Sequence, residues 1–399
     1  MRTGRTDQVD TTLVAAGRLR LPDGLGPGWL VVAGGRIVDA AAGPPPAAPD
    51  LELADGVLAP GLIDLQVNGA VGHDLGSADT DGWAEVAAWL PTTGVTAFAP
   101  TVITAPLEAI VAALDRHRQA RGLLDGAGGA RSLGVHVEGP FLAAARRGAH
   151  REELLVDPTP ERVEQLLEAG QDEITYVTLA PERAGALEAI AAFVDAGIRV
   201  AVGHSDASDD QVLAAADAGA TIVTHLYNGQ RPLHHRDPGV VGAALSDPRF
   251  TLGLIVDLVH VAPTAVRVAF AAAAGRVALV TDATAALGMP PGRYELGGEE
   301  VTIEEGRPPV RDDGTLAGAS LRLDAAVANT VACGIALEVA LDAATRVPAD
   351  ALGRADLGRI APDARADLVW LDDDLRARAT WVGGRLVAGR EAAGLSQLG

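Results

Sequence analysis

Short apolar segments alternate with amphipathic segments along most of the chain. Strands buried on both faces and separated by helices are typical of parallel βα units, and eight such units predict a closed (β/α)8 barrel of the TIM type. The eight apolar, strand-length segments are 61–68, 94–101, 133–139, 174–181, 198–204, 220–228, 250–257 and 276–283. Helical spacing between or after them is found at 81–90, 105–120, 159–169, 183–195, 209–218, 263–273 and 321–334.

The two ends of the chain have a different pattern. Residues 9–58 hold short β-like segments, interrupted by the linker-like AAAGPPPAAPD, and residues 366–390 hold two more. We expect these ends to pair into a small β-sandwich beside the barrel. The predicted domains are therefore 1–58 and 351–399 for the two parts of the sandwich, and 59–350 for a metal-dependent hydrolase barrel. The gap from 228 to 250 is longer than a usual connection, which predicts a functional loop.

The composition excludes several partners and chemistries. The chain has 32 basic and 53 acidic residues, a net charge of −21, which argues against nucleic acid or an anionic membrane as partner. All 32 basic residues are arginine, so a Schiff-base lysine and a carboxylated-lysine metal bridge are impossible. The single cysteine, Cys333, excludes an internal disulfide and a cysteine-built zinc site. Without a signal-like or membrane-spanning stretch, a cytoplasmic protein is expected.

Polar residues occur where the predicted barrel strands end. Active sites of TIM barrels lie at the carboxyl ends of the strands, so we expect these side chains to converge. Glu138, His204 and His225 offer one carboxylate and two imidazoles, a set that suits zinc with an open position for water. Asp282, at the end of the last strand, is a candidate general base. The other polar residues at strand ends are Gln66, Asn68, His136, Asn228, Asp257 and His260.

Several of these histidines and amides have more than one interpretation. His136 shares a strand face with Glu138, and either ligation or support of the ligands from behind fits its position. Gln66 and Asn68 face the same way on the first strand. They either satisfy backbone groups at the strand end or hydrogen-bond to the neighbouring ligands or the bound water. His117 lies in the polar segment LDRHRQA and is predicted to be a solvated surface residue.

Six motifs occur together in the order that one known family has them. The chain resembles the N-acetylglucosamine-6-phosphate deacetylases of the amidohydrolase superfamily. The motifs are PGLIDLQVNG (60–69), GVHVEGPFLAAARRGAH (134–150), VGHSDAS (202–208), THLYNGQRPLHHRDPG (224–239), LVTDATAALG (279–288) and GTLAGASLRLDAAV (314–327). The resemblance implies hydrolysis of N-acetyl-D-glucosamine 6-phosphate to D-glucosamine 6-phosphate and acetate. One alternative is deacetylation of N-acetylgalactosamine 6-phosphate or another N-acetylated sugar phosphate; the other is a catalytically silent barrel that binds sugar phosphate.

The resemblance also bears on the metal. Many amidohydrolases bind a second metal through His-x-His at the end of the first strand, where this chain has Gln66 and Asn68. Neutral amides are weak ligands beside imidazole, and no lysine is available to bridge two metals. We therefore expect one divalent ion per subunit on Glu138, His204 and His225. Zinc is the expected ion, with iron or another divalent ion as the alternative.

Catalytic roles follow from the same resemblance. The metal is expected to acidify a water molecule, and Asp282 to take its proton and pass it to the leaving amine. His150, together with the metal, would polarise the acetamide carbonyl and stabilise the oxyanion. The segment AAARRGAH, which ends at His150, resembles a mobile lid.

Substrate contacts can be carried over in the same way. In the family, an asparagine, the following backbone N–H and an arginine contact the phosphate, and here they match Asn228, Gly229 and Arg236. Position 229 is often alanine in the family. A histidine that contacts the sugar matches His260. We expect a homodimer or higher homo-oligomer, and whether Arg236 acts in its own subunit or across the interface stays open.

Overall fold

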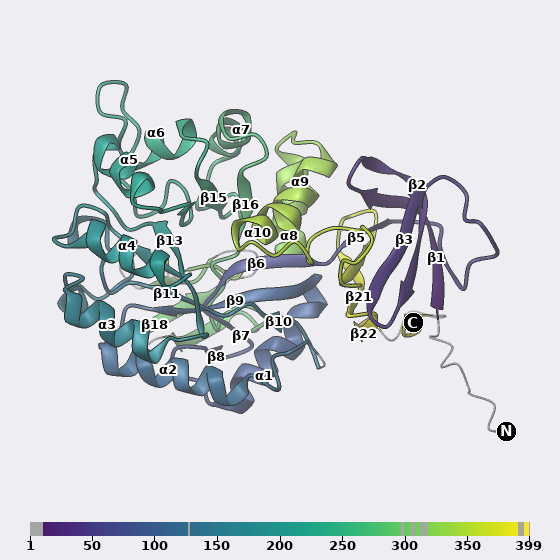
Figure 1. The fold of residues 1–399 in the computed structure, drawn as a ribbon, viewed down its shortest axis with the longest axis horizontal. Coiled ribbons are helices and arrows are strands. Elements are labelled where there is room, and N and C mark those ends of the chain that lie inside the picture. Colours follow the sequence, from purple (N-terminus) through teal and green to yellow (C-terminus); the bar gives the residue numbers. More distant parts are fainter. Residues whose placement is uncertain are drawn as a thin grey trace.

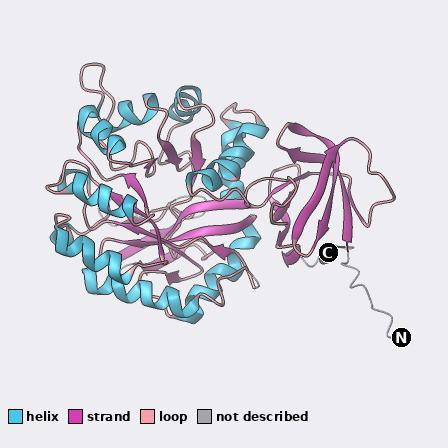
Figure 2. Ribbon diagram, in the orientation of Figure 1, coloured by secondary structure: helices cyan, strands magenta, loops and turns pink. Residues whose placement is uncertain are grey.

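The fold is a barrel of parallel strands wrapped by helices, with a separate sheet beside it (Figures 1 and 2). This computed structural model describes residues 11–126, 128–296, 299–304, 308–311, 316, 318–389 and 395–398. Within these residues, no helix is long and apolar enough to cross a membrane. The predicted fold class is confirmed.

Eight strand positions form the barrel, each in the segment where the apolar pattern predicts it. Neighbouring strands pair in parallel, and short β10 (Arg131–Ser132) pairs beside the second strand. The ring closes where the Asp282 N–H donates to the Gln66 carbonyl at 3.0 Å and the Asn68 N–H donates to the Ala283 carbonyl at 2.7 Å. The barrel strands are β6 (Leu62–Val67), β9 (Val95–Ile103), β11 (Val135–Glu138), β12 (Ile174–Leu179), β13 (Arg199–Val202), β14 (Ile222–Val223), β15 (Thr251–Leu254) and β16 (Val277–Leu279).

All seven predicted helices are present, and the described residues form three further α-helices that were not predicted. Helix α5 shows how local sequence sets a boundary, because Ser208 and Gln211 form a reciprocal capping box at its start. The predicted helices are α1 (Thr80–Trp89), α2 (Leu107–Ala120), α3 (Pro160–Ala169), α4 (Ala186–Asp195), α5 (Asp209–Asp217), α7 (Pro263–Ala272) and α8 (Leu323–Ala332). The additional helices are α6 (Gly239–Ser246), α9 (Leu337–Ala344) and α10 (Arg346–Ala351). Helix α6 shortens the loop expected between 228 and 250.

His117 is buried, so the prediction of a solvated residue was wrong. It lies on the buried stripe of α2, seven residues after Ile110 and three after Leu114, and is 4% exposed. Its Nδ1 lies 2.5 Å from Glu173 Oε2 and its Nε2 lies 2.8 Å from Ser132 Oγ. The polar neighbours in the sequence hid this position because they occupy the opposite, solvated face of the same helix.

The two chain ends share one sheet, as expected. Strand β5 near the start of the chain pairs antiparallel with β20 near its end, through Leu58 and Trp370 among others. The predicted domain limits at 58 and 350 stay a prediction. The sheet contains β1 (Thr11–Leu21), β2 (Gly24–Ala33), β3 (Arg36–Ala42), β4 (Leu51–Leu53), β5 (Val57–Pro60), β20 (Leu368–Leu371), β21 (Ala377–Val382) and β22 (Arg385–Ala388).

Two small sheets at the barrel were not predicted. One is the hairpin of β7 (Gly69–Ala70) and β8 (His73–Asp74), directly after the first barrel strand. The other, after the last barrel strand, contains β17 (Gly292–Leu296), β18 (Glu299–Ile303) and β19 (Val310–Arg311). Both follow the carboxyl ends of barrel strands, which is the side on which active sites form.

Candidate active site

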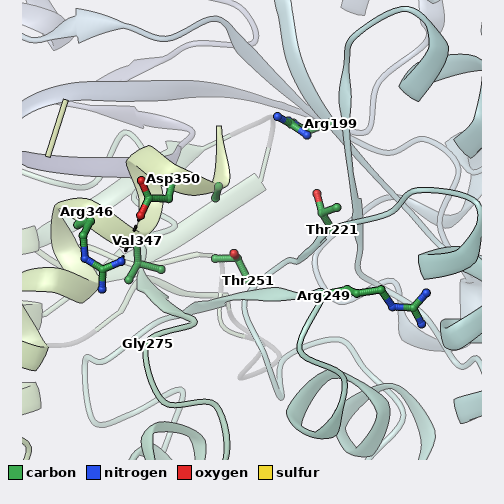
Figure 3. A pocket seen from close by; sticks show the side chains of 9 residues that line it. Arg199, Thr221, Arg249, Thr251, Gly275, Arg346, Val347 and Asp350 are labelled. Carbon is green, nitrogen blue, oxygen red and sulfur yellow. Dashed lines mark hydrogen bonds and ion pairs between the residues drawn. The ribbon is translucent and has the colours of Figure 1, made fainter. Parts of the chain in front are cut away.

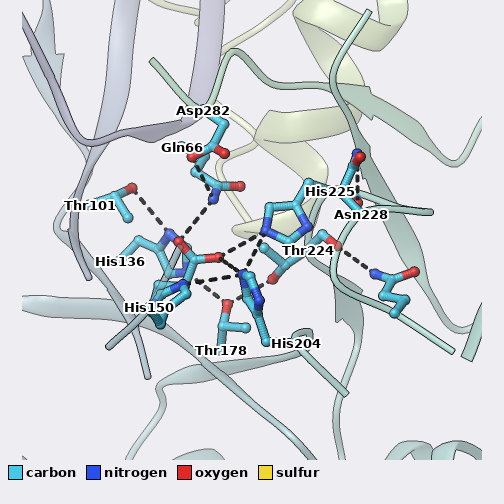
Figure 4. Close-up of polar contacts among 12 residues, drawn as sticks. Gln66, Thr101, His136, His150, Thr178, His204, Thr224, His225, Asn228 and Asp282 are labelled. Atoms are coloured by element: carbon cyan, nitrogen blue, oxygen red, sulfur yellow. Dashed lines mark hydrogen bonds and ion pairs between the residues drawn. The ribbon is translucent and has the colours of Figure 1, made fainter. Parts of the chain in front are cut away.

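Glu138, His204 and His225 meet at the carboxyl end of the barrel. Figure 4 shows the rings of His204 and His225 next to each other. Glu138 ends β11, and the two histidines follow β13 and β14. Glu138 Oε1 lies 3.1 Å from His225 Nε2 and 3.3 Å from His204 Nε2, and the two Nε2 atoms lie 3.1 Å apart. All three residues are buried, with at most 6% exposed. The structure therefore brings the three predicted ligands together.

The geometry of this cluster suits a divalent cation. Three atoms that each lie about 2.0–2.1 Å from one tetrahedral ion are separated by about 3.3 Å, close to the observed spacing. Burial opposes charge on Glu138, but hydrogen bonds from His204 and His225 outweigh burial and hold its pKa well below the usual range. For His225 burial also opposes the charge, yet the bond to Glu138 raises the pKa. The cluster therefore favours a carboxylate surrounded by positive charge, as a bound metal would supply.

Strained backbone turns the second and third ligands and the candidate base into the barrel. The φ angles are +45° at His204, +28° at His225 and +52° at Asp282, in the left-handed region that residues other than glycine rarely adopt. Such conformations cost of order 1–3 kcal/mol each and concentrate at functional sites. All three residues lie two or three positions after the end of a barrel strand, so the strain occurs where the chain leaves the sheet.

Asp282 is held by the two amides of the first strand. Its Oδ1 accepts from Asn68 Nδ2 at 2.7 Å and from Gln66 Nε2 at 3.1 Å. The Gln66 amide also donates to Glu138 Oε2 at 3.1 Å, so one NH2 group joins a ligand carboxylate to the candidate base. Burial and the nearby charge of Glu138 raise the pKa of Asp282. Of the interpretations considered for the two amides, hydrogen bonding to neighbouring site residues fits this structure.

His150 lies beside the ligand cluster, on the segment predicted to form a lid. Its Nε2 lies 3.2 Å from His204 Nε2, and its Nδ1 lies 2.8 Å from Thr104 Oγ1. His204 Nδ1 donates to the Arg146 carbonyl of the same segment at 2.9 Å. Burial and the neighbouring His204 lower the pKa of His150 to about 3, so the ring is neutral. Sequence reasoning missed Thr104, because nothing in its local pattern separates it from other threonines.

His136 lies on strand β11, two residues before Glu138, and its ring contacts two threonine hydroxyls. Nδ1 lies 3.1 Å from Thr101 Oγ1 and Nε2 lies 2.7 Å from Thr178 Oγ1, so both ring nitrogens have partners and neither faces the ligand cluster. The ring stacks on Tyr176 at 3.8 Å between centroids. Burial lowers the pKa of His136 to about 3. Of the two predicted alternatives, this geometry favours support over ligation.

The predicted substrate residues divide into two groups. Asn228, Gly229 and His260 line the same cavity of about 360 Å³ as the ligands, Asn68, His150 and Asp282. His260 is oriented by Asp257, whose Oδ2 lies 2.6 Å from its Nδ1. Gly229 has φ +57°, and a methyl group added there would lie 2.7 Å from His204 Nδ1, so this loop packs closely on a ligand. Arg236, in contrast, is exposed and does not line the cavity of its own chain.

A second cavity, of about 240 Å³, lies at the opposite end of the barrel, where β13 and β15 begin. Figure 3 shows the side chains that line it. Arg199, Arg249 and Arg346 line it, which suggests an anion site. Two of these charges are already compensated, however: Arg249 pairs with Asp217 and Asp247, and Arg346 pairs with Asp342 and Asp350. The amino end of a TIM barrel usually serves stability, and we assign this cavity no chemistry.

Comparison with known proteins gives the class. The Amidohydrolase family model matches residues 57–387. An N-acetylglucosamine-6-phosphate deacetylase of Vibrio furnissii is 41% identical over 333 residues, which cover 83% of this chain and 82% of that protein. The N-acetylgalactosamine-6-phosphate deacetylase of Escherichia coli O157:H7 is 41% identical over 335 residues, 83% and 88% of the two chains. The chain therefore belongs to the amidohydrolase family.

A solved structure extends the agreement to the whole fold. It is a mutant N-acetyl-D-glucosamine-6-phosphate deacetylase from Mycobacterium smegmatis in complex with N-acetyl-D-glucosamine-6-phosphate. It superposes with a TM-score of 0.89 at 38% identity, covering 95% of this chain and 100% of that one. The resemblance to these deacetylases is confirmed, and so is the prediction that the chain is a hydrolase.

Proposed function

We propose that this protein hydrolyses the acetamide of N-acetyl-D-glucosamine 6-phosphate to D-glucosamine 6-phosphate and acetate, in the breakdown or recycling of amino sugars. The observation that carries the proposal is the buried Glu138, His204 and His225 cluster, with Asp282 and His150 facing the same cavity. The relatives of about 40% identity that are named deacetylases support the substrate class.

One zinc ion per subunit would be held by Glu138, His204 and His225. When bound, it supplies the Lewis acid that acidifies water and polarises an amide carbonyl. A second ion is not expected, because the Gln66 and Asn68 amides already donate hydrogen bonds to Asp282. Zinc is proposed over iron because two imidazoles and one carboxylate are a usual catalytic zinc set.

Asp282 carries the proton between the attacking water and the leaving amine. Both amide hydrogen bonds go to its Oδ1, and none of the described residues donates to its Oδ2, which is left to accept the proton. The raised pKa of Asp282 brings this carboxyl closer to neutral pH, where a general base works best. His150, as a neutral ring, donates a hydrogen bond to the amide oxygen as negative charge develops on it.

The phosphate is proposed to bind Asn228, the Gly229 N–H and an arginine. Arg236 is exposed in its own chain, which supports a homodimer in which this guanidinium reaches the cavity of the other copy. Arginine suits this task because its planar fork pairs with phosphate through two hydrogen bonds. The homodimer and the cytoplasmic location stay predictions, and sedimentation of the wild-type chain tests the first.

A second candidate substrate is the galacto epimer. The N-acetylgalactosamine-6-phosphate deacetylase relative is as similar to this chain as the N-acetylglucosamine-6-phosphate relatives are. A silent sugar-phosphate-binding barrel is disfavoured, because the ligand set and Asp282 are all present and converge.

Acetate release tests the proposal. Zinc-loaded protein is incubated with N-acetylglucosamine 6-phosphate, its galacto epimer and unphosphorylated N-acetylglucosamine, and kcat/KM is measured for each. The gluco phosphate should be the best substrate, and the unphosphorylated sugar should lose the binding energy of the phosphate. If none of the three releases acetate faster than the Glu138→Gln variant does, the proposed function is wrong.

A further inference from the structure

Thr104 lies in the cavity wall directly behind His150. It follows strand β9, is 7% exposed, and its hydroxyl oxygen lies 2.8 Å from His150 Nδ1. We propose that Thr104 is a positioning residue that fixes the tautomer of His150, so that Nε2 of this ring carries the hydrogen presented to the substrate's amide oxygen. The inference rests on the proposed function, because it assigns that hydrogen to the deacetylation.

The tautomer of the neighbouring ring is fixed first. A carbonyl oxygen only accepts hydrogen bonds, so the 2.9 Å contact between His204 Nδ1 and the Arg146 carbonyl places a hydrogen on Nδ1. In the form in which imidazole binds a metal, His204 then offers a bare lone pair on Nε2. His150 Nε2 lies 3.2 Å from that lone pair.

The contact with His204 determines which ring nitrogen of His150 carries the hydrogen. When no metal is bound, a bare Nε2 on both rings would place two lone pairs 3.2 Å apart, which is repulsive. If Nε2 carries the hydrogen, it donates to His204 when no metal is bound, and it stays available to a substrate oxygen when His204 holds the metal. The neutral ring then has a bare Nδ1, and this nitrogen needs a donor. The Thr104 hydroxyl, 2.8 Å away, is that donor.

The hydroxyl of Thr104 has one competing acceptor. The Glu138 carbonyl oxygen lies 3.4 Å from Thr104 Oγ1, near the limit for a hydrogen bond. Donation to Glu138 would require His150 Nδ1 to carry the hydrogen and would recreate the lone-pair contact with His204. The shorter contact and the absence of this repulsion both favour donation from Thr104 to His150. In other active sites a carboxylate or carbonyl fixes the tautomer of a histidine by accepting a hydrogen bond from the ring. Here the Thr104 hydroxyl fixes the tautomer by donating a hydrogen bond to the ring.

Three variants test the role kinetically. Thr104→Val keeps the shape and removes the hydroxyl, and Thr104→Ser keeps the hydroxyl. Thr96→Val is the matched control, a buried threonine on the same strand whose hydroxyl bonds to the Leu62 carbonyl away from the cavity. We expect Thr104→Val to lower kcat by about 10- to 100-fold with little change in KM, because the oxyanion donor is present in only part of the molecules. Thr104→Ser should restore most of kcat, and Thr96→Val should keep it.

A readout without turnover separates this inference from the proposed function. In zinc-loaded protein with 15N-labelled histidine, the ring nitrogen shifts report which nitrogen carries hydrogen, and His150→Asn assigns the signal. Wild type and Thr104→Ser should show hydrogen on Nε2 of His150, and Thr104→Val should show a mixture. If Thr104→Val does not fold, Thr104→Ala replaces it. Hydrogen on Nδ1 of His150 in the wild type, or full kcat in a folded variant without the hydroxyl, overturns the inference. Absence of any deacetylase activity with hydrogen on Nε2 instead refutes the function alone.

Discussion

Asp282→Asn separates the roles that a carboxylate at this position can have. The structure predicts that asparagine can keep the local hydrogen bonds, because its Oδ1 can still accept from Asn68 and Gln66. Its NH2 group then replaces the carboxylate oxygen that accepts the proton. The substitution therefore removes proton transfer and leaves the surrounding contacts in place.

The expected loss of rate is that of an enzyme without its general base. Loss of a positioned general base costs about 10²–10⁴ in rate, or about 3–5 kcal/mol of activation free energy. Zinc should be retained, because the three proposed ligands Glu138, His204 and His225 remain. Substrate affinity should change little, since the phosphate contacts lie elsewhere in the cavity.

The assay pairs binding with chemistry. Zinc per chain and the Kd for substrate are measured on one side, and single-turnover acetate release on the other. Glu138→Gln is the comparison, because it removes the only ligand charge and should lose the metal. If Asp282→Asn loses zinc as Glu138→Gln does, Asp282 is chiefly a ligand. If it keeps more than about one tenth of the wild-type rate, another residue is the base.

Three further predictions concern the metal, the phosphate and stability. Wild-type protein reconstituted with excess zinc should plateau near one equivalent by elemental analysis, and two tightly held equivalents would contradict the amide interpretation. Arg236→Ala should reduce kcat/KM for the phosphorylated substrate far more than for N-acetylglucosamine. The control Arg267→Ala, on the surface of α7, should change kcat/KM for neither sugar. Equal losses for both sugars in Arg236→Ala would assign Arg236 to the fold or interface. Burial raises the pKa of Asp64 from 3.8 to about 7, so between these pH values the folded state holds a proton that the unfolded chain releases. The free energy of unfolding should therefore fall by about 4 kcal/mol as pH rises from about 4 to 7. Asp64→Asn should abolish this slope in urea unfolding at pH 5 and pH 8; an unchanged slope would mean that Asp64 is ionised in the folded protein.

The barrel was predictable because its strands are apolar on both faces. All eight strands fall where the apolar pattern places them, since a buried parallel sheet leaves no room for a polar face. The seven predicted helices fall where the sequence has helical spacing. Helices α9 and α10 were missed because they follow the eighth βα unit, where the repeat gives no further expectation. The β17–β19 sheet was missed because it is an insertion, which the barrel repeat does not specify.

The site was predictable as a set of residues but not as a set of contacts. Glu138, His204 and His225 stand out in the sequence because charged and imidazole groups end apolar strands. Thr104 does not, because its role depends on His150, which lies 46 residues later in the chain. His117 was misjudged although its spacing from Ile110 and Leu114 places it on the buried stripe of α2. The sequence could not show its partner Glu173, which lies 56 residues later in the chain. Long-range pairing of this kind has no local signal.

The two amides explain how this site differs from one with two metals. Glu138 and Asp282 are acidic groups within one buried region, and two carboxylates in such a place repel each other unless positive charge or donors lie between them. A second cation is one solution. Here the Gln66 NH2 group donates to both carboxylates, and Asn68 donates again to Asp282. These N–H donors offset the effect only in part, so burial and the charge of Glu138 leave the pKa of Asp282 raised. A second cation would lower that pKa and make Asp282 a weaker base, so the amides favour a carboxylate that takes up a proton from water over one that remains ionised.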